Sequence, residues 1–403
     1  MQFTDVWIPY GGYWSSPFCA WQGSFAALPP IPLAAELTVR ALAARGIAPA
    51  AIDGLCLGTT VPSRHSFYGA PWFAGLAGLG HLSGPTINQA CATSVRCLVQ
   101  AAQELITGSA TVYLAAAADR CSNGPHLYYP DPAGPGGTGE AENWVMDNFG
   151  HDPYARNSML QTAENVAREA GISREVQEEV TLLRYRQYAT TLEDGGAFHG
   201  RYMVRPVEVR APRGKKVLAA VTGDEGVRPT TTQGLAGLKP VLDGGTVTPG
   251  TQTHPADGHA AVLVTAGHDR ARGLSRDGSV AVQLLSYGQA RERQGFMPMS
   301  IAPAAERALA RAGIRAGDLA SITTHNPFAV NDVFLVRALG LDPERMNRHG
   351  CSLVWGHPQG PTGLRSIIEL IEDLALLGGG YGLFVGCAAG DSAAAVVLKV
   401  SIG

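Results

Sequence analysis

Residues 91–118 read CATSVRCLVQAAQELITGSATVYLAAAA, and residues 360–387 read GPTGLRSIIELIEDLALLGGGYGLFVGC. Both stretches run from small residues into a helical pattern and then through glycine into an apolar strand. They share threonine at 93 and 362, arginine at 96 and 365, and leucine at 105 and 374. A second pair, residues 40–55 and 307–322, matches an alanine-rich helix, a Gly-Ile stop and a strand at nearly the same offset. Chance explains either pair alone, but two pairs in one order predict an architectural unit used twice.

Buried strands that alternate with helical patterns place the chain in the α/β class. Composition changes between the two copies, where DPAGPGGTG at 131–139 is typical of a connector. Ser173 is expected to cap a polar helix with an acidic first turn. We therefore predict an N-terminal half at 1–120 that is completed by 249–273, an inserted cover domain at 121–248 and a C-terminal half at 274–403.

The composition limits the classes of function. The chain has 403 residues, 45% of them hydrophobic and 16% charged, and a formal net charge of -3. A nucleic-acid surface or an anionic membrane is therefore not expected as principal partner. The first residues lack the pattern of a secretory signal, and no stretch of about 20 residues is both apolar and poor in glycine, so we expect a cytoplasmic protein without a membrane span. Seven cysteines without C-x-x-C spacing indicate neither a disulfide framework nor a zinc ribbon.

Four side chains that could do chemistry follow predicted strands. Cys91 precedes a helix, whose dipole favours a thiolate, and His357 lies at the equivalent junction of the second copy. Pro358 after it suits a first helical turn. His325 and Cys387 end two further strands. Because α/β proteins bind ligands at this edge of the sheet, two thiols and two imidazoles without metal-ligand spacing favour nucleophilic catalysis over zinc. For each residue alone, a purely structural cysteine or histidine stays open.

Together these segments resemble the thiolase family over nearly the whole chain. NQACATS at 88–94 is similar to its nucleophile motif, and HNPFA at 325–329 to its N-E-A-F or H-E-A-F block. NRHGCSLVWGHPQGPTG at 347–363 is similar to its glycine-histidine-proline signature, and GCAAG at 386–390 takes the place of its C-x-G-G turn. Further landmarks follow in the family's order, namely TAENVA at 162–167, RPTTT at 228–232, LKP at 238–240, and GTVTPG followed by DGHAA within 245–261.

The resemblance implies a duplicated βαβαβαββ core in five layers, α-β-α-β-α, with an inserted loop domain. It also implies a CoA-dependent acyltransferase that makes or cleaves the carbon–carbon bond of a 3-oxoacyl-CoA. His357 would take the proton of Cys91, Cys91 would form an acyl-enzyme, and Cys387 would act as acid and base toward the second substrate. CoA and acyl-CoA would be substrates, with no permanently bound cofactor or metal. Since family members are at least dimers, we expect a homodimer or a dimer of dimers.

The resemblance further implies groups that bind charge and CoA. The backbone amides of Cys91 and Ala389 would hold one oxyanion, and His325 with His357 would hold the enolate oxygen. The implied contacts of CoA are Thr253 and Phe328 on the pantetheine arm, and Arg213, Lys215 and Arg228 on its phosphates. Solvated surface charge is the alternative for the last three.

Several departures from the family pattern bear on the substrate. CATS replaces the usual C-x-S-G, HPAD at 254–257 replaces G-x-N-D, and Asn326 stands where glutamate is usual. Ala389 must offer its amide where glycine is common, and His325 is closer to the sterol-carrier and trifunctional-protein branches. One alternative is a thiolase-like acyl-CoA-binding subunit without turnover, against which the intact cysteines count. The other is a ketosynthase-like condensing enzyme, which would carry histidine or asparagine where Cys387 stands.

Overall fold

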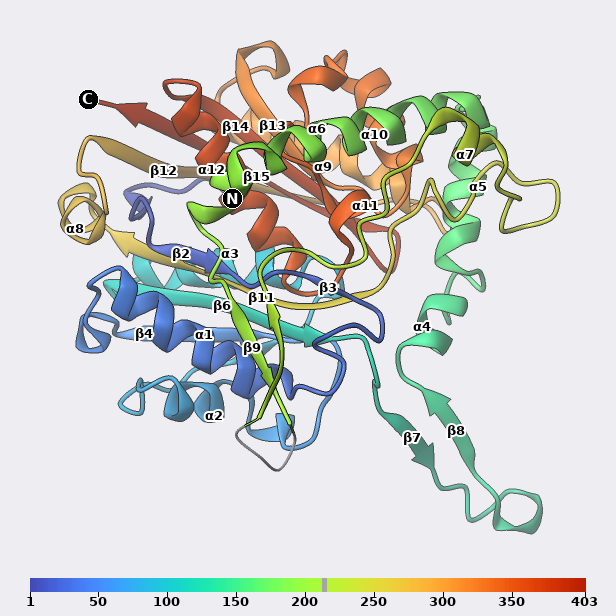
Figure 1. Cartoon of the computed structure of the whole chain (residues 1–403), viewed down its shortest axis with the longest axis horizontal. Coiled ribbons are helices and arrows are strands. Elements are labelled where there is room, and N and C mark those ends of the chain that lie inside the picture. The colour runs from blue at the N-terminus through green and yellow to red at the C-terminus, as the bar shows by residue number, and fades with distance from the viewer. Residues whose placement is uncertain (212–215) are drawn as a thin grey trace.

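A computed structural model describes residues 1–211 and 216–403 (Figure 1). Its core is a mixed sheet of eleven strands in the order β13-β14-β15-β12-β1-β11-β6-β4-β5, with β2 and β3 paired to β11. The short strand β1 (Val6–Ile8) is antiparallel to both β11 and β12. It therefore joins an N-terminal half-sheet to a C-terminal one.

The N-terminal half contains the helices and strands of the first copy of the repeat. Its apolar residues at 112–118 are buried and lie in a strand parallel to β4, as the sequence predicts. The elements are β2 (Tyr13–Ser15), β3 (Cys19–Ala20), α1 (Pro30–Ala44), β4 (Gly54–Gly58), α2 (Gly69–Leu76), β5 (Thr86–Ile87), α3 (Thr93–Ile106), β6 (Val112–Arg120) and, after the insertion, β11 (Ala256–Ala266) and α8 (His268–Leu274).

The C-terminal half repeats this order with one strand reduced. Its elements are β12 (Val280–Arg291), α9 (Ile301–Ala312), β13 (Leu319–His325), α10 (Ala329–Leu339), α11 (Ser352–Trp355), α12 (Thr362–Leu376), β14 (Gly380–Ala388) and β15 (Ser392–Ile402). Where the first copy has β5, the second has a single parallel bridge between Ile322 and Met346. The predicted duplication is confirmed, because α1-β4 corresponds to α9-β13 and α3-β6 to α12-β14.

The helices form three layers around the two half-sheets. Between the halves α3 and α12 pack on each other, and the Leu364 amide donates to Ser94 Oγ at 3.0 Å. Helices α1 and α2 cover the outer face of β4, β6 and β11, while α9 covers β12, β14 and β15. Separate apolar clusters fill these interfaces, with Leu98 and Ile367 in the middle, Leu114 on one side and Leu383 on the other. The predicted five-layer arrangement is confirmed.

The inserted segment covers the edge of the core. It contains β7 (His126–Tyr129), β8 (Glu140–Asn143), α4 (Met146–Gly150), α5 (Met159–Glu169), α6 (Arg174–Gly200), β9 (Val207–Arg210), β10 (Val217–Val221) and α7 (Thr232–Ala236). The hairpin β7-β8 projects from the body as an arm, with the predicted connector at its tip (Figure 1). Ser173 caps α6 as predicted, and Arg184 of α6 pairs with Asp332 of α10 at 2.8 Å, both side chains being buried. The domain boundaries stay a prediction.

No helix within the described ranges is long and apolar enough to cross a membrane.

Candidate active site

A tight turn between β5 and α3 presents Cys91. The turn contains Ala90 in a left-handed conformation, at φ 45°. The hydroxyl of Thr93 closes it by accepting from the Gln89 amide and donating to the Ala90 carbonyl, both at 2.7 Å. Cys91 therefore lies two residues before the helix, at its positive end.

The second copy builds a corresponding turn before α12, but not as the sequence predicts. Pro358 does not enter the helix, because α12 begins only at Thr362. The left-handed Gln359, at φ 62°, inserts a further turn, so the predicted helix start was wrong. His357 is fixed instead by its backbone, which donates to the carbonyl of His254 at 2.9 Å. Its ring Nδ1 lies 2.7 Å from Thr362 Oγ1.

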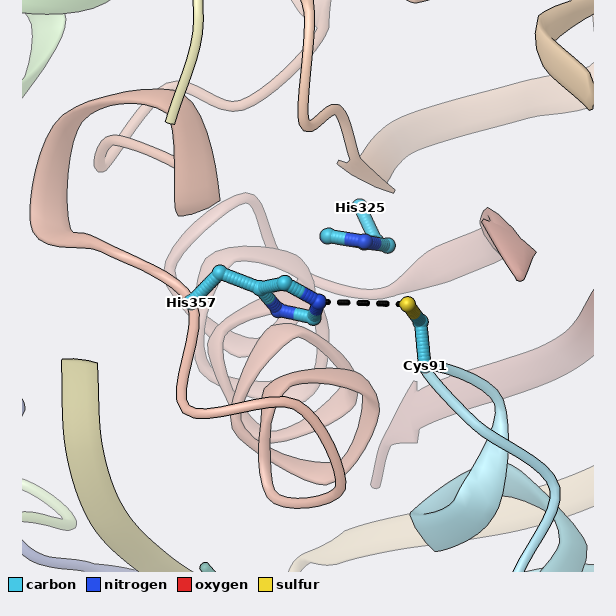
Figure 2. Close-up of side chains that lie close together, drawn as sticks. All are labelled: Cys91, His325 and His357. Carbon is cyan, nitrogen blue, oxygen red and sulfur yellow. Dashed lines mark hydrogen bonds between the residues drawn. The ribbon is translucent and has the colours of Figure 1, made fainter. Parts of the chain in front are cut away.

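Cys91, His325 and His357 meet at this point, although they come from both halves of the chain (Figure 2). His357 Nε2 lies 3.2 Å from Cys91 Sγ, and the two imidazole rings stack with centroids 4.1 Å apart. His325 ends β13, and its Nδ1 lies 2.9 Å from Ser352 Oγ. Its Nε2 is buried with no hydrogen-bond partner among the described residues. A ring nitrogen without a partner among those residues thus remains near the thiol.

Burial keeps the three side chains uncharged. It raises the pKa of Cys91 to about 11, against the opposing effect of the amides of Ala389 and Cys91, which are directed at the sulfur. Burial lowers the pKa of His325 to about 3, and burial together with His325 holds the pKa of His357 well below its usual range. Desolvation therefore outweighs the helix dipole, and the resting form of Cys91 is the thiol, although the dipole favours the thiolate. A neutral imidazole faces a neutral thiol.

Cys387 lies behind this pair at the end of β14 and is 1% exposed. The side-chain amide of Asn331 donates to its sulfur at 3.2 Å. Burial, and then the nearby Cys91, raise the pKa of the Cys387 thiol well above its ordinary value. The Ala389 amide, two residues on, is directed at Cys91, as the prediction of a shared anion site requires.

Asp119 ties the two halves together beneath the site. Its carboxylate accepts hydrogen bonds from residues 59–61 and, at 2.9 Å, from the Gly360 amide in the loop that carries His357. A Cβ on Gly360 would lie 2.6 Å from that carboxylate oxygen, so glycine is required there. Burial raises the pKa of Asp119 to about 6.

A cavity of about 640 Å³ opens onto Cys91 and His357. Thr253 and Phe328, predicted to contact CoA, both line it, whereas Arg228 is exposed and does not. Arg213 and Lys215 lie outside the described residues. Most of the other lining side chains are apolar, and the larger ones are Trp144, Val145, Phe149, Met159, Leu160 and Met297. The size suits a ligand with a long arm.

Cys91, His325 and His357 are also the one group among the described residues whose ligand atoms could hold a metal, all lying within 4.8 Å of one another. One sulfur and two imidazole nitrogens are a donor set that zinc accepts. The 3.2 Å contact between His357 and Cys91 equally suits proton transfer from a nucleophile. The geometry of the three side chains therefore fits both a metal site and a nucleophile with its base, and the family of the protein distinguishes the two.

The fold and the site together define a class of α/β enzyme, in which one half of a duplicated core supplies a cysteine and the other half a histidine within hydrogen-bonding distance. Residues 14–268 match the model of the thiolase N-terminal domain, and residues 279–400 match that of the thiolase C-terminal domain. The chain belongs to the thiolase family.

Individual relatives agree with this assignment. The beta-ketothiolase BktB of Cupriavidus necator is 31% identical over 78% of this chain and 78% of its own length. An acetyl-CoA acetyltransferase of Bacillus anthracis superposes with a TM-score of 0.89 at 25% identity, over 99% of both chains. The human mitochondrial 3-ketoacyl-CoA thiolase, solved in complex with CoA, superposes with a TM-score of 0.87 at 25% identity, over 98% of this chain and 97% of its own.

Sequence reasoning missed several residues that shape the site. Asp119 is the last residue but one of β6 and directly follows an apolar run in the sequence, which is a signal that could have identified it. Gln359 lies in the cavity wall, although no role was predicted for it. Thr362 is one of the two threonines shared by the copies, so its place was visible in the sequence, but its contact with His357 was not predicted. Ser352, the partner of His325, carries no local signal, because the two residues lie 27 positions apart.

Proposed function

We propose that this chain cleaves or forms the carbon–carbon bond of a 3-oxoacyl-CoA through an acyl-cysteine at Cys91. The observation that carries the proposal is the 3.2 Å contact between Cys91 Sγ and His357 Nε2, with the Ala389 amide directed at the same sulfur. The neutral imidazole can accept the thiol proton, which a protonated imidazole could not. Charge then separates only when a substrate has filled the cavity and excluded water.

In the direction of thiolysis, Cys91 Sγ gives its proton to His357 Nε2 and attacks the 3-oxo carbonyl carbon. An S–C bond forms and the carbonyl electron pair moves onto oxygen, where the amides of Cys91 and Ala389 receive the charge. Each such donor contributes about 3 kcal/mol to lowering the barrier. When the carbonyl reforms, the C2–C3 bond breaks and its electron pair leaves on the shorter acyl-CoA as an enolate.

His325 is suited to hold that enolate oxygen. The Ser352 hydroxyl lies closer to His325 Nδ1, at 2.9 Å, than to Asn326 Oδ1, at 3.1 Å. A hydroxyl that donates to Nδ1 leaves the ring proton on Nε2, the buried atom without a partner. Nε2 then donates to the enolate oxygen beside protonated His357.

Cys387 completes the reaction as acid and then as base. Its thiol protonates the enolate carbon, and its thiolate, stabilised by the Asn331 amide, takes the proton of an incoming CoA thiol. The CoA sulfur attacks the acyl carbon on Cys91, the S–C bond to Cys91 breaks, and Sγ recovers its proton from His357. Condensation is the same sequence in reverse.

CoA and acyl-CoA are the proposed substrates, with the pantetheine arm in the cavity beside Thr253 and Phe328. Thr253 Oγ1 donates to the Ser352 carbonyl at 2.5 Å, so it would also hold the loop next to His325. We retain the exposed Arg228 as a proposed contact of the CoA phosphates. A ketosynthase-like reaction is disfavoured because position 387 is cysteine.

We also propose a homodimer or a dimer of dimers in the cytoplasm. Strand β5 ends the sheet with an open edge, and Phe67 nearby is 95% exposed, which is unusual for a surface that stays in water. Sedimentation velocity tests the oligomer, and fractionation of the source cells tests the compartment.

The test of the reaction is thiolysis of acetoacetyl-CoA and longer 3-oxoacyl-CoA by free CoA, followed by the loss of enolate absorbance. We expect Cys91→Ser to lower the rate at least about 1000-fold. The matched control is Cys97→Ala, since that thiol is buried further along α3 and should leave the rate nearly unchanged. Absence of turnover with every chain length, together with no acylation of Cys91 by mass spectrometry, would support a binding subunit instead.

A further inference from the structure

Gln359 is a polar side chain placed where the backbone disfavours it. It adopts φ 62°, a conformation that glycine or asparagine tolerates better, and is only 7% exposed. It nevertheless lines the cavity, and its Oε1 lies 3.5 Å from Cys91 Sγ. A strained residue that points an amide at the reacting atom calls for a functional explanation.

The resting thiol does not use this amide fully. A thiol has one proton, and His357 Nε2 at 3.2 Å is closer to it than Gln359 Oε1 at 3.5 Å. The Nε2 amide nitrogen of Gln359 has no hydrogen-bond partner among the described residues, although it carries two donors. The side chain therefore keeps hydrogen-bonding capacity for a group that enters the cavity.

The group within reach is the acyl chain on Cys91. In an acyl-enzyme the carbonyl oxygen turns toward the amides of Cys91 and Ala389. The next two carbons then lie roughly 3 to 4 Å from the sulfur, as bond lengths require. Gln359 contacts the sulfur from the cavity wall, so its amide meets a substituent on one of these carbons.

The other residues of the cavity wall indicate whether the site accepts a charged or an uncharged substituent. Trp144 lines the cavity with its indole fixed by a 2.8 Å hydrogen bond to the Thr60 carbonyl, and Phe149 and Met297 extend the apolar surface. Within the described ranges, no lysine or arginine lines the cavity, and the one lining carboxylate, Asp152, lies next to His151 in the wall. A carboxylate on the acyl group would thus find no permanent cation, while an uncharged oxygen would find the Gln359 amide.

We propose that Gln359 makes the enzyme select acyl groups that carry an uncharged oxygen, above all a hydroxyl, on the first or second carbon beyond the thioester carbonyl. The inference rests on the proposed acyl-cysteine at Cys91. A hydroxyl both donates to Oε1 and accepts from Nε2, whereas an alkyl group of the same size leaves the buried amide unpaired. A site built this way discriminates against the analogue that lacks the polar group.

The experiment compares acyl donors of equal size. Acylation of Cys91 is followed by intact-protein mass spectrometry with glycolyl-CoA against propionyl-CoA, and with 3-hydroxypropionyl-CoA against butyryl-CoA. The ratio of rates within each pair is measured for the wild type and for Gln359→Met, so that intrinsic reactivity cancels. We expect this substitution to lower the ratio roughly tenfold in at least one pair, as loss of a buried hydrogen bond implies.

Gln252→Met is the matched control, because Gln252 lines the same cavity without contacting the sulfur, and it should preserve both ratios. Gln359→Asn, which suits the left-handed backbone but withdraws the amide by one methylene, should also lower the ratio. Ratios unchanged in both Gln359 variants would overturn the inference and leave the proposed function intact. No acylation of Cys91 by any donor would instead overturn the proposed function.

Discussion

Replacing Asp119 with asparagine should displace the loop that carries His357 while changing the free energy of unfolding little. The Asp119 carboxylate is 1% exposed, and every group that hydrogen-bonds to it is a donor. One of these donors is the Gly360 amide, three residues after His357. An asparagine must place an NH₂ group where one carboxylate oxygen stood, and Gly360 then faces a second donor.

The two energetic consequences nearly cancel. Burial raises the pKa of Asp119 from 3.8 to about 6, so keeping the carboxylate ionised at pH 7.5 costs about 3 kcal/mol. Asparagine removes that cost. Leaving the buried Gly360 amide unpaired costs about 1–3 kcal/mol. The free energy of unfolding should therefore change by less than about 2 kcal/mol, while the loop that carries His357 loses its anchor.

Activity should respond far more strongly than stability. A displacement of about 1 Å in a catalytic group can lower a rate about 100-fold, and we expect a loss of that order in kcat for thiolysis. The charge of Asp119 also raises the pKa of Cys91, so the variant should alkylate Cys91 at lower pH than the wild type does. Iodoacetamide labelling across pH measures this shift.

Urea unfolding across pH tests the energetic argument. Because the folded pKa is raised, the stability due to protonated Asp119 is fully present below about pH 3.8 and lost as pH rises through about 6. The free energy of unfolding of Asp119→Asn should lack this dependence on pH. The control is Asp257→Asn, since Asp257 is equally buried, with a pKa raised to about 6, but bonds to Ser122 rather than to the catalytic loop. Equal kcat values for the two variants would refute the reasoning.

Three further outcomes are expected. Alkylation of Cys91 in the free enzyme should have its midpoint near pH 11, because burial raises the pKa of the thiol; a midpoint below about pH 8 would indicate a thiolate–imidazolium pair instead. Arg365→Met should destabilise the protein by about 3–5 kcal/mol in urea unfolding, since it leaves buried Asp224 unpaired, whereas Arg186→Ala, at an exposed ion pair, should cost less than about 1 kcal/mol. Cys387→Ala should still acylate Cys91 from acetyl-CoA but lose carbon–carbon bond chemistry at least about 100-fold, and parallel losses in both assays would contradict its role as acid and base.

Much of the fold was predictable because the two copies repeat a pattern of local preferences. Local sequence determines where an apolar strand, a glycine stop or an alanine-rich helix forms. The matched segments therefore locate α3-β6 and α12-β14 correctly. The start of α12 was not predictable in the same way. Pro358 is compatible with a first helical turn, but the left-handed Gln359 delays the helix to Thr362.

Only those features of the candidate site that follow from the chain topology were predictable. The halves of a duplicated core face each other, so Cys91 and His357 could be expected to meet, and they do. The rise in the pKa of Cys91 was not predictable, because a helix terminus is visible in the sequence whereas the depth of burial is not. The role of Asp119 was not predicted although the residue follows an apolar run, because its contact with Gly360 spans 241 residues.

The duplication also explains how one backbone turn came to serve two chemical purposes. Ala90 and Gln359 occupy corresponding places before α3 and α12, and both are left-handed. In the first copy the Thr93 hydroxyl closes the turn and the next residue is Cys91. In the second copy the corresponding Thr362 hydroxyl holds the imidazole of His357, and the left-handed position itself carries the Gln359 amide. Because the two turns face each other, Gln359 comes within 3.5 Å of Cys91. In the first half this position only shapes the turn, whereas in the second half it places the Gln359 amide next to the acyl group that Cys91 would carry.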